Sequence, residues 1–137
     1  MWVEANSGSG GGGGSETETT LWTNPRPSSG FNEDNVYLSV FYTDYKKIGF
    51  YYKNYANTDN EYVTYYDKEE IDKWYSNTGK YGLGSIAARY NNKNYTRYIS
   101  VSYTSNGSVF TISQCYQHAS SSSAASAVLP TKITGIN

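Results

Sequence analysis

Four carboxylates within one short segment are the first residues whose types and spacing could perform chemistry. They are Asp67, Glu69, Glu70 and Asp72, in the sequence DKEEIDKWY. Two carboxylates can hydrolyse a glycosidic bond when they flank it and when burial keeps one of them protonated. Lys68 and Lys73 lie among these four, so the segment compensates its own charge, which is typical of a solvated stretch. The segment therefore favours no catalytic role.

The single cysteine and the single histidine, Cys115 and His118, are the next candidates for chemistry. A thiol nucleophile needs a base within hydrogen-bond reach, but their spacing along a strand puts the two side chains on opposite faces. We expect Cys115 to pack as a small apolar side chain or to face the polar side near Tyr98. The loop at Asp59 lacks the ligand pattern of a calcium site, and Gly82–Gly84 is too short for a phosphate loop. The sequence therefore predicts a protein that is not an enzyme and that uses no metal or cofactor.

Aromatic side chains are the remaining candidates, because the chain contains 16 Tyr and 17% of its residues are aromatic. The rings that we expect to lie outside the core belong to loops rich in Asn, Ser, Thr and Asp. They are Trp74, Tyr75, Tyr81, Tyr90 and Tyr95, together with Tyr98. Such rings stack on sugars while polar neighbours bind the hydroxyls, and Tyr also suits protein recognition because it loses little entropy on ordering. We take the first five as predicted ligand-binding residues; the alternative is that they cover β faces or line a subunit interface.

The elements that must position these rings are strands, and the clearest of them form a hairpin between Asn94 and His118. Asn106-Gly107 indicates a two-residue type I′ turn, because both residues tolerate the positive φ angles that this turn needs. The resulting register pairs Tyr103 with Phe110, Val101 with Ile112, and Ile99 with Gln114. The apolar residues of both strands then share a core face. Hydroxyl groups cover the other face, from Ser100, Ser102, Thr104, Thr111 and Ser113.

Five further strands are expected, each bounded by turn residues. They are residues 35–42, 47–55, 61–66, 83–90 and 128–137. Pro130 indicates a sheet edge or a bulge at the start of the last strand, because proline cannot donate to the ladder. The pattern predicts an all-β fold, an antiparallel β-sandwich or jelly-roll-like domain of about seven short strands. Residues 67–75 fit either one or two helical turns or a charged loop, and a small α+β domain would require a packed helix there.

Residues 1–20 are expected to form a flexible N-terminal tail, with the β-sandwich domain at 21–137. Residues 7–15, SGSGGGGGS, behave as a flexible linker. Trp2 and Val3 belong to an apolar tripeptide that could dock elsewhere as an anchor, and the alternative is a frayed N-terminus. A glycine run of this kind can also be a cloning linker.

The charge balance and the single cysteine limit the classes of partner. With 11 basic and 12 acidic residues, nothing predicts a nucleic-acid partner or an anionic membrane surface. No apolar run is long enough to cross a membrane, and the first residues lack the regions of a signal peptide. One cysteine excludes an internal disulfide and is compatible with synthesis in a reducing cytoplasm.

Both ends of the predicted domain resemble motifs of a known family. Residues 21–31, LWTNPRPSSGF, resemble the L-W-T-N-P-x-P-x-S-x-F opening of a small domain in tail-associated structural proteins of phages and prophages of Gram-positive bacteria. Residues 97–116 are similar to that family's R-x-v-x-v-s hairpin ending in Cys-Tyr, and residues 128–136 to its closing P-x-K-I-x-G-I segment. The resemblance covers about residues 21–137, with the middle matching only in strand pattern, and it offers no catalytic residues.

The resemblance implies a non-enzymatic virion structural protein, a tail or head appendage or fibre knob that adheres to host cell-surface glycan. It also implies other virion proteins as partners, a homo-oligomer with a trimer as the analogous state, and localisation in the virion after synthesis in the host cytoplasm. Two features depart from the family: residues 80–94 are rich in Tyr and Asn, and the domain follows a short glycine leash instead of a long fibre. The alternative is a free carbohydrate-binding module. A wall hydrolase, a third class, would require catalytic carboxylates.

Overall fold

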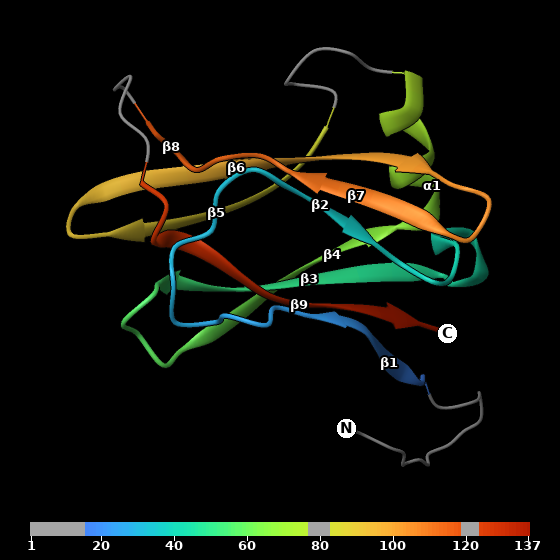
Figure 1. Cartoon of the computed structure of the whole chain (residues 1–137), viewed down its shortest axis with the longest axis horizontal. Coiled ribbons are helices and arrows are strands. Elements are labelled where there is room, and N and C mark those ends of the chain that lie inside the picture. The colour runs from blue at the N-terminus through green and yellow to red at the C-terminus, as the bar shows by residue number, and fades with distance from the viewer. Residues whose placement is uncertain (1–15, 77–82, 119–123) are drawn as a thin grey trace.

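Two antiparallel sheets pack against each other in the computed structural model, which describes residues 16–76, 83–118 and 124–137 (Figure 1). Sheet A has the order β1 (Glu18–Thr23), β9 (Ala127–Ile136), β3 (Lys47–Tyr55) and β4 (Glu61–Asp67). Sheet B has the order β2 (Asp34–Tyr37), β7 (Ser108–Ile112), β6 (Lys93–Tyr103) and β5 (Gly84–Tyr90), and β8 (Tyr116–Gln117) also pairs with β6. The predicted all-β sandwich is confirmed, with nine strands in the described part of the chain where about seven were expected.

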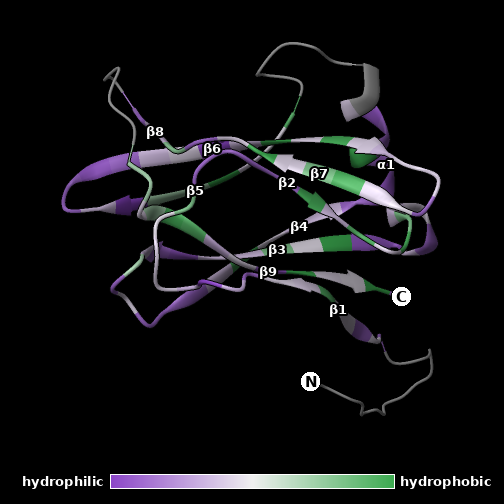
Figure 2. Ribbon diagram, viewed as in Figure 1, coloured by the Kyte–Doolittle hydropathy of each residue, from purple (hydrophilic) through white to green (hydrophobic). Residues whose placement is uncertain are grey.

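The core lies between the sheets, where alternate side chains of β6 are buried and nearly all residues of the central strand β9 are buried. Phe50 of β3 and Phe110 of β7 meet edge to face across the core, with ring centroids 5.1 Å apart. Figure 2 shows that the turns joining β3 to β4 and β5 to β6 are hydrophilic, whereas the strands of both sheets carry the hydrophobic residues. Full burial of each such side chain stabilises the fold by about 1.5–3 kcal/mol.

The charged segment after β4 is helical and packs against the core. It forms α1 (Lys68–Asp72) followed by a 3₁₀ turn, η3 (Lys73–Ser76). Ile71 and Trp74 share one face and are buried, and a methyl group at Gly84 would lie only 2.3 Å from the Trp74 ring. The helical alternative is therefore right and the charged loop is wrong, although the helix is too short to change the fold class. In the described ranges, no helix has the length and apolar character to span a membrane.

The β6–β7 hairpin forms, but its predicted register is wrong by two residues. Val101 pairs with Phe110, Ile99 with Ile112, and Tyr103 with Ser108. The segment after β2 explains the shift. The Ser108 amide donates to the Val40 carbonyl and the Ser108 carbonyl accepts from the Leu38 amide, at the place where the predicted two-residue turn would close. Residues 104–107 therefore form a longer loop, and Gly107 is needed there since a Cβ would lie 2.2 Å from the Leu38 carbonyl oxygen. Tyr103, expected to close the core, is 66% exposed.

The positive φ angles expected at Asn106-Gly107 occur instead at the turn between β5 and β6. Asn91 and Asn92 have φ angles of 50° and 62°, and they join Tyr90 to its partner Lys93. A two-residue loop with both angles positive has the type I′ form. The register error on β6 spans two residues, so no side chain changes face. Ser100, Ser102 and Thr111 lie on the outer face as expected, together with the buried Val109, whereas Thr104 and Ser113 lie outside the two strands.

The start of β1, the end of β2 and the position of β9 in its sheet differ from expectation. β1 begins at Glu18, ahead of the expected domain start at Leu21, and pairs with β9. β2 ends at Tyr37, where residues 35–42 were expected to continue, and a 3₁₀ turn, η2 (Tyr42–Asp44), follows. β9 is a central strand with a register shift beside Pro130, where Tyr51 pairs with Lys132 and Tyr52 with Pro130. Of the two alternatives for Pro130, the bulge is correct.

Candidate functional site

Two of the predicted ligand-binding rings lie in the core. Trp74 is 5% exposed and packs against both Phe50 and Phe110, with ring centroids 6.2 and 6.4 Å away. Tyr95 is 6% exposed, on the same face of β6 as Ile99. The expectation that these two rings lie outside the core is therefore wrong, because each occupies an inward position of its element.

The other predicted site residues are half-buried or lie outside the described part. The Tyr90 ring is half-buried and stacks on Tyr55, with centroids 4.5 Å apart and planes inclined by 16°. Tyr98, also half-buried, lies near Tyr116 on the outer face of sheet B. The remaining residues lie outside the described residues or have side chains that do: Tyr75, Tyr81, Trp2 and Val3.

A different aromatic group occupies the outer face of sheet A, and we name it the tyrosine cluster. It consists of Glu18 on β1, Lys47 and Tyr51 on β3, Tyr65 on β4, and Lys132 and Thr134 on β9. The strand register brings these side chains together, because Tyr51 pairs with Lys132 and Gly49 pairs with both Tyr65 and Thr134. Four strands, distant in sequence, therefore build one surface.

The carboxylate of Glu18 is the acceptor at the centre of the tyrosine cluster. Tyr51 donates its hydroxyl to it, Thr134 donates from Oγ1 at 2.8 Å, and Tyr65 donates from 3.4 Å. The two phenol oxygens lie 3.0 Å apart. Burial alone would raise the pKa of Glu18, but these hydrogen bonds and the nearby Lys132 lower it below its ordinary value. Burial and the Glu18 carboxylate raise the pKa of Tyr51, so at neutral pH the carboxylate stays charged and the phenol stays protonated.

Two ammonium groups flank the rings of the tyrosine cluster. Lys132 Nζ lies 4.5 Å from the centroid of the Tyr51 ring, and Lys47 Nζ lies 5.3 Å from that of Tyr65. The two rings meet edge to face, with centroids 6.4 Å apart. A Cβ at Gly49 would lie 2.8 Å from the Tyr65 ring, so the missing side chain allows this ring to cross the sheet. Tyr65 remains 39% exposed and presents an aromatic surface beside hydroxyl, carboxylate and ammonium groups.

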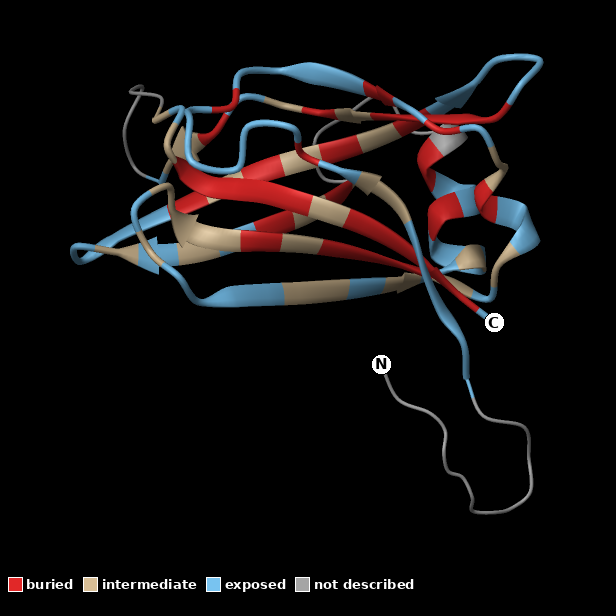
Figure 3. Cartoon of the chain, turned by 60° about the horizontal axis from the view of Figure 1, so that its bottom comes forward, coloured by how far each residue is buried: buried red, intermediate tan, exposed pale blue. Residues whose placement is uncertain are grey.

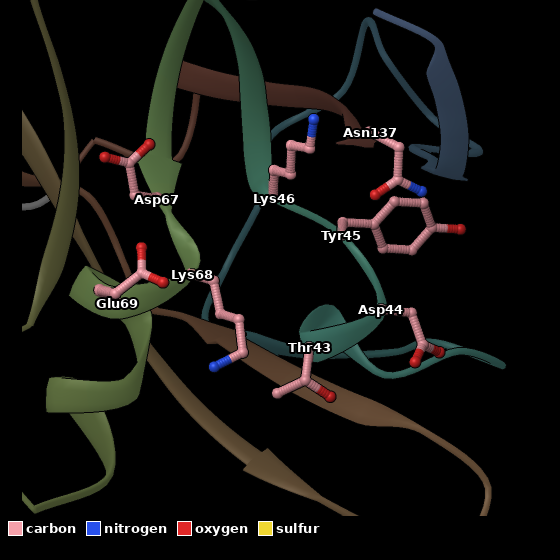
Figure 4. A pocket seen from close by; sticks show the side chains of 8 residues that line it. All are labelled: Thr43, Asp44, Tyr45, Lys46, Asp67, Lys68, Glu69 and Asn137. Atoms are coloured by element: carbon pink, nitrogen blue, oxygen red, sulfur yellow. The ribbon is translucent and has the colours of Figure 1, made fainter.

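The carboxylate segment borders an open depression of about 520 Å³ at one end of the sandwich. Figure 4 shows its lining side chains, which are Thr43, Asp44, Tyr45, Lys46, Asp67, Lys68, Glu69 and Asn137. Asp72 turns to structural partners instead, accepting from the Tyr42 hydroxyl at 2.5 Å and from Lys68 at 3.1 Å. The Tyr42 hydrogen bond, followed by that from Lys68, lowers the pKa of Asp72. Within the described ranges, no three Asp, Glu, His or Cys side chains are grouped to hold a metal ion.

Residues of both terminal motifs meet at the start of β9. The guanidinium of Arg97 is buried and donates to the backbone carbonyls of four residues: Val128 at 2.8 Å, Ser113 and Ala125 at 3.0 Å, and Ala127 at 3.1 Å. Asn24 is also buried and donates from Nδ2 to the Pro130 carbonyl at 2.7 Å. Burial lowers the pKa of Arg97 to about 10, so it stays protonated at neutral pH. This polar group positions β9 between its neighbours.

The tyrosine cluster was missed in the sequence for two reasons. Glu18 lies in the segment assigned to the tail, although the alternation in ETETT is compatible with a strand. The adjacent tyrosines in EYVTYY (β4) obscured which face of that strand is buried. In the neighbouring strand β3, however, Lys47, Gly49 and Tyr51 are spaced two apart and so share one face. No model of a known protein family matches the chain, and no curated protein matches it in sequence.

Proposed function

We propose that this chain is a non-enzymatic structural protein of a virion, an appendage domain of a phage tail or head whose tyrosine cluster contacts host cell-surface glycan. The tyrosine cluster carries the glycan part of the proposal. The virion part rests on the resemblance of residues 21–31, 97–116 and 128–136 to tail-associated proteins. Other virion proteins are the partners that this role requires, and the virion is its location.

The chemistry of the tyrosine cluster suits a neutral or weakly charged saccharide. A sugar ring stacks on an aromatic face through its C–H groups, and its hydroxyls need donors and acceptors at the ring's edge. Tyr65 supplies the exposed face, Glu18 and the two phenols supply polar partners, and Lys47 and Lys132 supply further donors. These groups already bond one another, so their geometry is set before a ligand arrives and less ordering entropy is lost on binding.

The packing of the terminal motifs is a second support. Asn24, Arg97 and Pro130 belong to the motifs that carry the resemblance, and all three act through backbone contacts at β9. If the residues that a family shares serve to hold a strand in place, its members share a fold and would differ in their exposed surfaces. This agrees with a structural protein whose ligand contacts vary.

Binding to bacterial cell-surface polysaccharides, immobilised as an array, tests the glycan part. We expect Tyr65→Ala to lower the affinity for the bound glycan by about 5- to 150-fold, if a sugar stacked on one ring contributes about 1–3 kcal/mol, as a nucleic-acid base does. Tyr65→Phe keeps the ring and should retain most of the binding. Tyr103→Ala removes an equally large exposed ring from sheet B and serves as the matched control. Equal losses in Tyr65→Ala and Tyr103→Ala, or no glycan bound, would refute this part.

Detection of the chain in purified phage particles tests the virion part separately. Mass spectrometry of particles from the strain that encodes the chain should find it at a fixed ratio to the other virion proteins. A chain that binds glycan but is missing from particles would instead be a free carbohydrate-binding module, the second candidate. The exposed Tyr65 ring favours that candidate equally, so only the particle experiment separates the two.

A further inference from the structure

The two sheets have four edge strands, and three of them are protected against pairing with another chain. The edges are β1 and β4 in sheet A and β2 and β5 in sheet B. An edge strand exposes unpaired backbone groups, and proteins protect such edges by keeping them short, by bulges or by covering them. β2 has only four residues. β1 contains a register shift between Thr20 and Trp22, a bulge that twists it away from a neighbour.

The edge of β5 is covered by side chains from sheet A. Tyr66 of β4 places its hydroxyl against Ser85, accepting from the Ser85 amide at 2.9 Å and donating to the Ser85 carbonyl at 2.8 Å. Asn54 donates from Nδ2 to the carbonyl of Arg89, further along the same strand, at 3.3 Å. Side chains therefore occupy the positions where a further strand would form its hydrogen bonds.

β4 has none of these protections among the described residues. Its seven residues, EYVTYYD, include no Gly or Pro, pair regularly with β3 and are mostly aromatic or β-branched, which favours extended structure. Charged side chains stand only at its ends, Glu61 and Asp67. Tyr62 and Tyr65 are two of the four exposed large hydrophobic side chains in the described part, at 43% and 39%. In Figure 3, β4 is the outermost strand of sheet A, beyond β9 and β3, and no described segment runs alongside it.

We propose that β4 pairs antiparallel with β4 of a second copy of this chain, which joins the two copies into one continuous sheet. The occupant is a second copy because the strand is complementary to itself. When Val63 faces Val63 of the partner, Glu61 faces Tyr65 and Tyr62 faces Thr64, so no like charges meet among the paired residues 61–65. Asp67 then lies beyond the paired strands, level with Asp59 in the turn before β4. A register centred on Thr64 would place Glu61 opposite Asp67 twice, and like charges directly opposite destabilise a sheet.

The symmetry of this pairing has a consequence for the tyrosine cluster. A two-fold axis that relates antiparallel strands of one sheet is perpendicular to that sheet, so both copies present the same outer face on the same side. The two tyrosine clusters would then lie on one surface, with both copies of Tyr65 close to the joint. The pairing itself does not depend on what the cluster binds, and its test is independent of any glycan.

Sedimentation of the full chain over a range of concentrations is the first test. We expect a reversible monomer–dimer equilibrium, and Val63→Lys should weaken the dimer by at least about tenfold because two ammonium groups would face each other across the axis. Ala87→Lys adds the same charge to the exposed middle of the β5 edge and should leave the dimer unchanged. A wild-type chain that stays monomeric at its highest soluble concentration, or that forms a trimer, would overturn the proposal.

Disulfide trapping is the second test, and it does not require the variant to disrupt anything. Directly opposite residues of antiparallel strands have Cα atoms about 4.5–5.5 Å apart, within the range that a disulfide spans. Val63→Cys should therefore form a covalent dimer on mild oxidation, and a mixture of Glu61→Cys and Tyr65→Cys should form the mixed dimer. The native Cys115 is fully buried and does not interfere. Cross-linking of Val63→Cys no faster than that of an Ala87→Cys control would contradict the register.

Discussion

The hydroxyl of Tyr66 on β4 bonds both backbone groups of Ser85 on β5, accepting from the amide at 2.9 Å and donating to the carbonyl at 2.8 Å. A single phenol thus replaces the neighbouring strand that β5 lacks, and it links the two sheets on the side where both end in an edge strand. Its ring also packs against Trp74, with centroids 5.0 Å apart.

Tyr66→Phe should therefore destabilise the fold by about 1–3 kcal/mol, because it leaves two half-buried backbone groups without their partner while keeping the ring in the core. Chemical denaturation measures this change. Tyr62→Phe, on the same strand but with an exposed ring, should change the free energy of unfolding by less than about 0.5 kcal/mol. Equal effects of the two variants would show that the phenol does not support β5.

Arg97→Met should be the more damaging change, lowering the free energy of unfolding by more than about 3 kcal/mol. Methionine fills a similar volume but removes the guanidinium hydrogen bonds to four carbonyl groups, two of which belong to the buried residues Ala127 and Val128. Val128 also has a φ of 45°, which is strained for a β-branched residue. Arg89→Met, at an exposed position on β5, provides the control and should be nearly neutral. A midpoint of denaturation for Arg97→Met close to that of Arg89→Met would disprove this role.

Glu18→Gln should make the stability of the fold depend less on pH in the acidic range. The pKa of Glu18 is lowered in the folded state, so the folded carboxyl binds protons less readily than the unfolded one. Its contribution to stability is complete above the ordinary value of 4.5 and is lost as the pH falls through the lowered folded value. Thermal unfolding should therefore show wild type more stable than Glu18→Gln at neutral pH and equal to it in strong acid. The exposed Glu33→Gln is the control, and a difference that persists unchanged into acid would contradict the assignment.

The observed turns predict opposite results for two asparagines. Asn92 has a φ of 62°, so Asn92→Ala should destabilise by about 1 kcal/mol and Asn92→Gly should be neutral or stabilising. Asn106 does not adopt a positive φ, so Asn106→Ala should change stability by less than about 0.5 kcal/mol. Urea denaturation of the three variants decides the point. A larger loss of stability in Asn106→Ala than in Asn92→Ala would instead support the type I′ turn expected in the β6–β7 hairpin.

Regular strands were predictable because the information for them is local. Residues 47–55 were predicted and observed with the same bounds, since alternation, β propensity and flanking turn residues agree there. The register of the β6–β7 hairpin was not predictable from its own residues. A favourable turn sequence at Asn106-Gly107 competes with the hydrogen bonds that Ser108 forms with the Leu38 amide and the Val40 carbonyl, and those partners come close only when the chain folds.

The tyrosine cluster was harder to predict because its residues are distant in sequence. Glu18 and Thr134 are hydrogen-bonded partners separated by 116 positions, and no local pattern identifies that contact. Trp74 was misplaced for the opposite reason. Its spacing from Ile71 indicated a helical apolar face, but the charged residues around it made the segment look solvated. Aromatic content alone therefore did not indicate which rings lie in the core and which lie on the surface.

The central position of β9 also determines when this domain can fold. β9 is the last of the nine described strands, yet it lies between β1 and β3 and supplies two of the four carbonyl groups that accept from Arg97. On a ribosome, β1, β3 and β4 would emerge long before the strand that joins them, so sheet A could assemble only after synthesis had passed residue 136. We therefore expect the domain to complete its fold slowly, only once β9 has emerged, and its aromatic strands to be prone to aggregation until then.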